Sequence, residues 1–155
     1  GCSRGGLAAA MMKCQPDVHA TGITLSDRQL VYAVNNLGKL AANDRVILSL
    51  LDYRHQTGHV DNIVSVGMLE HVGPGNFGTY FRKVSELLNA GGIAVIHSIG
   101  VDGRARLVNR WLQKYIFPGG FLALLDEMVA ATEMQGLKIL DLEIMQEQYT
   151  ETLKH

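Results

Sequence analysis

Between Val64 and Gly100 the chain reads VSVGMLEHVGPGNFGTYFRKVSELLNAGGIAVIHSIG, and this segment decides the fold. The runs Ile63–Gly67 and Ile93–Ile99 are apolar and rich in β-branched residues, which is typical of strands buried on both faces. Apolar side chains in Phe77–Leu88 recur at helical spacing, so this stretch predicts an amphipathic helix. A strand, a helix and a second strand joined by short connections predict parallel strands with a right-handed crossover.

Polar side chains accompany the ends of both predicted strands. Glu70 lies in the loop after the first strand, and His97 lies near the end of the second. Open parallel α/β sheets place ligands at the carboxyl ends of their strands, so we predict that both side chains face one crevice. A Met-Leu-Glu-His run at the mouth of a buried strand is not explained by packing, whereas a single His in an apolar strand is more often a core residue. The neighbouring His71 is expected to point into structure or solvent.

The same alternation of strand and helix extends over the rest of the chain. Before the central segment we expect a glycine-rich turn at Gly1–Gly6 that leads into a helix, and then a strand over Val18–Thr24. A capped helix over Ser26–Leu40 and a strand over Val46–Leu51 should follow. After the central segment we expect a helix over Leu122–Gln135 and a late strand over Leu137–Ile144. The pattern predicts one α/β domain with a doubly wound, mostly parallel sheet.

The composition is that of a single globular domain. Of the 155 residues 47% are hydrophobic and 19% are charged, and the formal net charge of -1 provides no broad basic surface for nucleic acid. Cys2 and Cys14 are too few for a disulfide framework and lack the spacing of a zinc site. These features predict a reducing, cytoplasmic location, no metal and no nucleic-acid partner.

A series of motifs gives the chain a specific resemblance over nearly its whole length. In order they are GCSRGG before a helix, ITLSDRQ, LLDYR, GMLEHVGPGNFGTYFRKV, IHSIG, KYIFPGG and QYTETL. With these motifs and their spacing, the chain resembles the cyclopropane fatty-acyl-phospholipid synthases and mycolic acid cyclopropane synthases. The resemblance implies the Rossmann-like sheet of class I S-adenosylmethionine-dependent methyltransferases. It also implies an incomplete sheet, with the first strand before Gly1 and the last strand after His155.

The resemblance implies a cofactor site for S-adenosylmethionine along the first half of the chain. A glycine-rich turn at a helix N-terminus suits a nucleotide-like ligand, because its amides point outward and the backbone can approach closely. Ser3 replaces a glycine usual in the family and is expected to crowd the methionine end of the cofactor. For Asp52 and Tyr53 a simple solvated turn is the alternative. The implied cofactor-binding residues are Gly1, Cys2, Ser3, Gly5, Thr24, Leu25, Gln29, Asp52 and Tyr53.

The resemblance implies that the catalytic group is built from Glu70, His97, the backbone of Ile99, and Tyr149. In the family these positions surround a bound bicarbonate. When an alkene attacks a sulfonium methyl it becomes a carbocation, and ring closure requires a proton to be removed from the transferred methyl. A weak base is sufficient for this step if it is accurately placed in a dry pocket.

The substrate implied by the resemblance is an unsaturated phospholipid or another acyl chain. An insertion at about 101–121 mixes basic and aromatic residues, so we expect it to face lipid and to hold the protein at the inner face of the membrane. A solvated helix with a buried aromatic stripe is the alternative for this insertion. Two further functions stay open, namely methyl transfer to another acceptor and cofactor binding without catalysis. The sequence also leaves a homodimer open.

Overall fold

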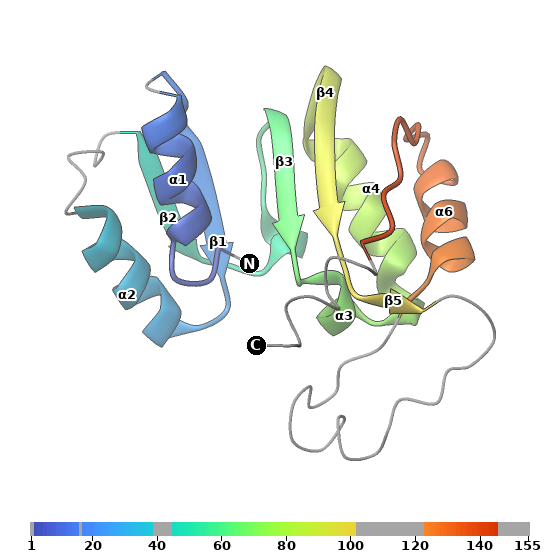
Figure 1. Ribbon diagram of the computed structural model, residues 1–155, viewed down its shortest axis with the longest axis horizontal. Helices are drawn as coiled ribbons and strands as arrows, with labels where there is room; N and C mark the ends of the chain where they lie inside the picture. The colour runs from blue at the N-terminus through green and yellow to red at the C-terminus, as the bar shows by residue number, and fades with distance from the viewer. Residues whose placement is uncertain (1, 16, 39–44, 102–122, 146–155) are drawn as a thin grey trace, which may run out of the picture.

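The computed structural model describes residues 2–15, 17–38, 45–101 and 123–145. Strands and helices alternate along most of the chain, as the apolar periodicity predicts (Figure 1). In chain order the elements are α1 (Gly6–Cys14), β1 (Ala20–Thr24), α2 (Asp27–Gly38), β2 (Val46–Leu50), η1 (Tyr53–His55), β3 (Val60–Val66), α3 (Leu69–Val72), η2 (Pro74–Asn76), α4 (Phe77–Leu87), β4 (Leu88–His97), β5 (Gly100–Val101), β6 (Ala123–Leu124) and α6 (Leu125–Glu133).

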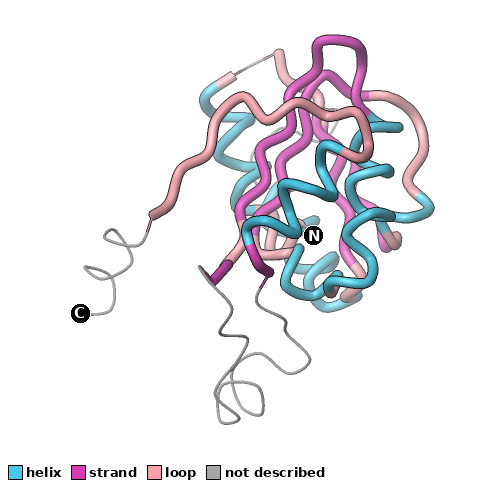
Figure 2. The backbone as a smooth tube through the Cα atoms, turned by 90° about the vertical axis from the view of Figure 1, so that its right-hand side faces the viewer, coloured by secondary structure: helices cyan, strands magenta, loops and turns pink. Residues whose placement is uncertain are grey.

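The longer strands form two separate parallel pairs. β1 pairs with β2, and β3 pairs with β4, but no ladder joins the two pairs within the described residues. Figure 1 shows α1 and α2 beside the first pair and α4 and α6 beside the second, and Figure 2 shows helices on either side of the strands. The arrangement is an incomplete Rossmann-like sheet, so the predicted fold class is confirmed. None of the described helices is long and apolar enough to span a membrane.

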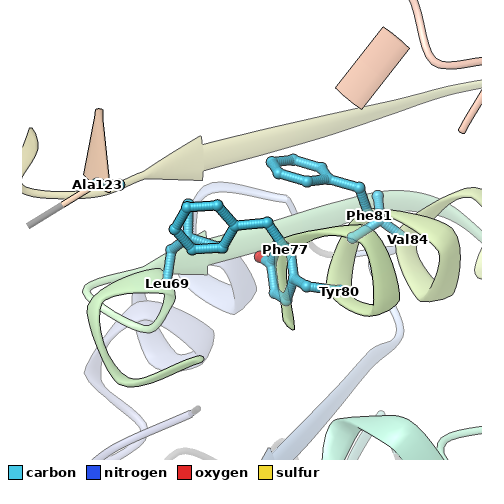
Figure 3. Close-up of a cluster of buried hydrophobic side chains, with 6 residues drawn as sticks. All are labelled: Leu69, Phe77, Tyr80, Phe81, Val84 and Ala123. Atoms are coloured by element: carbon cyan, nitrogen blue, oxygen red, sulfur yellow. The ribbon is translucent and has the colours of Figure 1, made fainter. Parts of the chain in front are cut away.

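The apolar stripe of α4 builds the core against β3, β4 and α6. Its buried side chains pack with the end of β3 and with β6, and α6 adds Met128 and Ala131. The stripe packs against Leu69 of α3, the helix that follows β3. This packing fixes the position of the carboxyl end of β3. The cluster, drawn in Figure 3, consists of Leu69, Phe77, Tyr80, Phe81, Val84 and Ala123.

Several predicted boundaries were wrong. The late strand expected at Leu137–Ile144 is absent, because residues 137–145 pair with no other strand that the structure describes. The chain between β3 and α4 is not a plain loop but contains the short helix α3. β4 begins at Leu88 and crosses the expected break at Asn89–Gly92, because a register shift near Asn62 absorbs the extra residues.

The ends of the predicted lipid-facing insertion are tied to each other. β5 and β6 form a short parallel ladder that pairs Gly100 with Ala123 and Val101 with Leu124. The helix predicted from Leu122 therefore begins later, as α6 at Leu125. Residues 102–121 lie outside the described part of the chain, so the lipid-facing role of the insertion stays a prediction.

Candidate functional site

The carboxyl ends of β3 and β4 lie next to each other. Val66 and His97 are partners in the ladder, and the Gly67 amide donates a hydrogen bond to the His97 carbonyl at 3.1 Å. In Figure 1 the arrowheads of both strands point toward the edge where α3 lies. This register agrees with the apolar faces of the two strands, because a slip by one residue would turn Ile63 or Ile96 away from the core.

Glu70 connects the two strand ends. It lies in α3, its exposed fraction is 6%, and its Oε1 accepts a hydrogen bond from the Ile99 amide at 2.6 Å. A hydrogen bond to a carboxylate is about twice as strong as one between neutral groups. The second carboxylate oxygen, Oε2, is buried and accepts no hydrogen bond from the described residues. The carboxylate is therefore fixed on one side and retains acceptor capacity on the other.

The structure brings three of the four predicted catalytic residues to one edge of the sheet. His97 is half-buried at the last position of β4, and Ile99 follows it and binds Glu70 through its amide. Tyr149, the fourth residue, lies outside the described part of the chain. His71 is exposed, which agrees with one of the two places expected for it.

The glycine-rich turn packs against β1. The Cys2 amide donates to the Ile23 carbonyl at 2.6 Å, and the Gly5 amide donates to the Cys2 carbonyl at 2.9 Å. The Cys2 thiol is half-buried, and burial raises its pKa. Ser3 has φ of 50°, the left-handed region that favours glycine, and its side chain is exposed. Gly1, also predicted to bind the cofactor, lies outside the described residues.

The N-terminus of α1 fits an anionic or nucleotide-like ligand. Its N-cap residue is Gly5, and no side chain caps the helix. A Cβ built on Gly6 would meet no atom within 4 Å, so the described residues leave the space beside the first turn open. Backbone amides that no side chain covers are the donors that such ligands use.

Thr24, at the end of β1, forms a hydrogen-bonded unit with the start of α2. Its hydroxyl donates to Gln29 Oε1 at 3.1 Å and accepts from the Ser26 amide at 3.2 Å. Ser26 Oγ in turn accepts from the Gln29 amide at 3.4 Å, the helix-capping arrangement expected from the sequence. Thr24 is buried, whereas Leu25 is 74% exposed. The predicted residues are thus adjacent, and the hydrogen bonds orient Gln29.

Asp52 is engaged mainly by its neighbour Arg54. Its Oδ1 accepts from the Arg54 amide and from Nε, both at 2.9 Å, and its Oδ2 accepts from Nη2 at 2.6 Å. The Arg54 side chain, followed by its amide, lowers the pKa of Asp52 to about 2. This pattern supports the alternative of a simple solvated turn for Asp52, because the carboxylate's hydrogen bonds are made within its own turn.

Tyr53 packs edge-on against Tyr80, with ring centroids 5.6 Å apart. Tyr53 was predicted to bind the cofactor, whereas Tyr80 was predicted only as part of the apolar stripe of α4. Tyr80 and Ser65 are both buried beside the site, and sequence reasoning missed them. The sequence feature that could have indicated them is a hydroxyl at an inward-facing position of an apolar helix or strand.

Within the described residues no group of three His, Cys, Asp or Glu side chains could hold a metal ion.

Comparisons with known proteins identify the family of this chain. The family model of mycolic acid cyclopropane synthetase matches residues 1–155. The chain is 37% identical over 162 residues to a probable fatty acid methyltransferase of Pseudomonas putida, covering 100% of this chain and 41% of that protein. It is 40% identical over 133 residues to the cyclopropane-fatty-acyl-phospholipid synthase of Escherichia coli strain K12, covering 86% and 34%.

A solved structure shows the same fold. The mycolic acid cyclopropane synthase CmaA1 complexed with SAH and CTAB superimposes with a TM-score of 0.84 at 25% identity, covering 99% of this chain and 58% of that one. The chain spans less than half the length of the two curated relatives. The family match nevertheless extends over the whole chain, and on that ground the chain belongs to the mycolic acid cyclopropane synthetase family.

Proposed function

We propose that the protein containing this chain transfers the methyl carbon of S-adenosylmethionine to a cis double bond of a lipid acyl chain and forms a cyclopropane ring. The observation that carries the proposal is the Glu70 carboxylate, buried at the joined ends of β3 and β4 and held by the Ile99 amide. A fixed carboxylate beside a histidine suits a reaction in which a proton must leave an accurately placed carbon.

The residues at the ends of β1 and β2 would hold the cofactor. The turn Cys2–Gly5 and the uncapped start of α1 provide backbone donors, Thr24 orients Gln29, and Tyr53 provides an aromatic face. The solved complex of CmaA1 with SAH supports the choice of cofactor, because SAH is what remains of S-adenosylmethionine after methyl transfer. When bound, the cofactor supplies a methyl group activated by a positive sulfur.

The groups at the ends of β3 and β4 would take part in removing the proton from the transferred methyl group. A bicarbonate fits these side chains, because its own hydroxyl can donate to a carboxylate oxygen of Glu70 and its other oxygens can accept from the imidazole of His97, which ends the neighbouring strand. Together with Tyr149, these residues would hold it, and it would supply a weak base for ring closure. The Ile99 amide keeps the Glu70 carboxylate oriented.

Methyl transfer to a fatty acid without ring closure is the second candidate. The specific observation that favours it is the 37% identity, over the whole chain, to a probable fatty acid methyltransferase. The two functions share the cofactor and the acyl substrate and differ in the fate of the proton. Upfield cyclopropyl proton signals in the NMR spectrum of extracted lipids would distinguish a ring from a methyl or methylene branch.

The proposal includes peripheral contact with the inner face of the membrane through the basic and aromatic residues at about 101–121. These residues lie outside the described part of the chain, and the contact is supported by their composition alone. Flotation of the full-length protein with vesicles of unsaturated anionic phospholipid tests it. A protein that stays at the bottom of the gradient at low salt would contradict membrane contact, and sedimentation of the same sample reports whether a dimer forms.

Mass spectrometry of membrane fatty acids provides the main test. A host that lacks its own enzyme expresses the full reading frame with native His97 or with His97→Ala. We expect monounsaturated chains to gain one CH2 in the first case and to stay unchanged in the second. Unchanged lipids in both cases, with the protein folded and the cofactor present, would contradict the proposed function.

A further inference from the structure

Three polar side-chain atoms, one each on β3, α3 and α4, are buried. They are Ser65 Oγ from β3, Glu70 Oε2 from α3 and the hydroxyl of Tyr80 from α4, and none of them has a hydrogen-bond partner in the part of the chain that the structure describes. The exposed fractions of these residues are 7%, 6% and 3%. Buried polar groups in native proteins are almost always hydrogen-bonded, so a group of such atoms on adjoining elements calls for an explanation.

The pKa of Tyr80 is influenced by both Ser65 and Glu70. Burial raises the pKa of Tyr80, the Ser65 hydroxyl partly opposes this rise, and the charges of Tyr53 and Glu70 add to it. The Ser65 and Tyr80 hydroxyls are close enough to interact but do not meet hydrogen-bond geometry as they stand. In Figure 3 the Tyr80 hydroxyl oxygen lies on the side of Leu69, the residue before Glu70.

The three groups are chemically complementary. An ionised carboxylate only accepts hydrogen bonds, whereas the hydroxyls of serine and tyrosine both donate and accept. A chain in which Ser65 donates to Tyr80 and Tyr80 donates to Glu70 Oε2 gives each of the three groups a hydrogen-bond partner. Small side-chain rotations would complete it, since serine hydroxyls and carboxylates turn easily.

We propose that Tyr80, supported by Ser65, is a positioning residue for Glu70. The Ile99 amide holds Oε1 from the side of β4, and the Tyr80 hydroxyl holds Oε2 from the side of α4. The carboxylate is thereby clamped between a strand end and a helix of the core. The inference rests on the proposed function in one respect, namely that Glu70 belongs to the reacting site. The ring of Tyr80 also touches Tyr53, so one core residue contacts both halves of the site.

The contact is tested without reference to activity. The full-length protein is labelled with tyrosine carrying 13C at Cζ, and the resonance lost in Tyr80→Phe identifies Tyr80. We expect this resonance to shift in Glu70→Gln and in Ser65→Ala, because each removes a hydrogen-bond partner of the phenol. A Tyr80 resonance that stays in place in both variants overturns the proposal, whether or not the protein is an active enzyme.

Kinetics test the positioning role. We expect Tyr80→Phe to lower kcat about tenfold with little change in the KM for cofactor, because a hydrogen bond to a charged group is lost while the ring remains. The control is Tyr32→Phe, which removes a hydroxyl from an exposed ring over which Arg4 lies at 5.5 Å, and which should leave kcat unchanged. A folded Tyr80→Phe variant with native kcat overturns the role. If that variant does not fold, Ser65→Ala takes its place, and native kcat there also counts against the role.

Discussion

The amide of Ile99 and the carboxylate of Glu70 meet at 2.6 Å, although one follows β4 and the other lies in α3 after β3. Their contact depends on the parallel register in which Val66 faces His97, since this register brings the two chain exits to the same edge. The backbone of one strand exit thus orients the acid of the other.

Replacing Glu70 by Gln removes the negative charge and keeps the shape of the side chain, so the two contributions can be told apart. The amide oxygen of Gln can still accept the Ile99 hydrogen bond, so we expect the free energy of unfolding to change by less than about 1 kcal/mol. Product formation should fall about 100-fold or more, because general acid–base groups contribute at least that much. The control is Glu86→Gln on α4, where the half-exposed Glu86 pairs with Arg82 and Lys83 of the same helix. Equal activity of the two variants would remove Glu70 from the catalytic group.

Two adjacent glycines should respond in opposite ways to alanine. Gly5 has φ of 76°, and a Cβ there would meet Ala33 Cβ at 3.1 Å and Leu37 Cδ1 at 3.3 Å. We expect Gly5→Ala to cost about 2–4 kcal/mol from left-handed strain and crowding. A Cβ on Gly6 would meet nothing within 4 Å, so Gly6→Ala should be neutral or slightly stabilising. Denaturant titration of both variants checks the contrast, and equal midpoints would contradict it.

Replacing Ser3 by glycine should relieve strain in the cofactor turn. The left-handed conformation destabilises the folded state by roughly 1–2 kcal/mol for a non-glycine residue. Glycine instead loses about 0.5–1 kcal/mol of stability, because its unfolded chain has more conformational entropy. The net gain in stability should therefore be about 0.5 kcal/mol. Because a side chain at this position is also expected to crowd the cofactor site, we expect Ser3→Gly to tighten binding of S-adenosylmethionine in calorimetry. Weaker binding would mean that the Ser3 hydroxyl contributes a contact.

The Asp52–Arg54 pair should affect stability only in acid. The pKa of Asp52 in the folded chain, about 2, lies below the ordinary value of 3.8. The carboxylate's contribution is therefore fully present above about pH 4 and is lost as the pH falls through 2. The Arg54 side chain is 59% exposed, so solvent screens the pair and its contribution to stability should be small.

Asp52→Asn provides the measurement for this pair. The variant keeps an acceptor oxygen for the Arg54 amide but loses the charge, so its loss of stability relative to the native protein should be seen at pH 6 and shrink toward pH 2. Thermal melts of both proteins at several pH values give the difference. A difference that grows in acid would show the opposite linkage.

Much of this fold follows from the sequence alone. The order of strands and helices was predicted because burial on both faces gives continuous apolar runs and helix packing gives an apolar stripe, and both patterns are local. Glu70 was predicted as a site residue because a carboxylate directly after a buried strand can be recognised in the sequence itself. The strand expected at Leu137–Ile144 shows the limit of such patterns, because a strand exists only when another strand edge accepts its hydrogen bonds.

The tertiary structure alone decided which groups meet at the site. The resemblance grouped Glu70 with the Ile99 backbone, but no spacing in the sequence indicates that the Ile99 amide donates to Glu70 or that the Ser65 and Tyr80 hydroxyls are buried. Those relationships depend on strand register and on how α4 lies across the sheet, which join residues distant in the chain. Periodicity reports which side of an element is apolar, but the partner of a polar group is set by the packing of several elements at once.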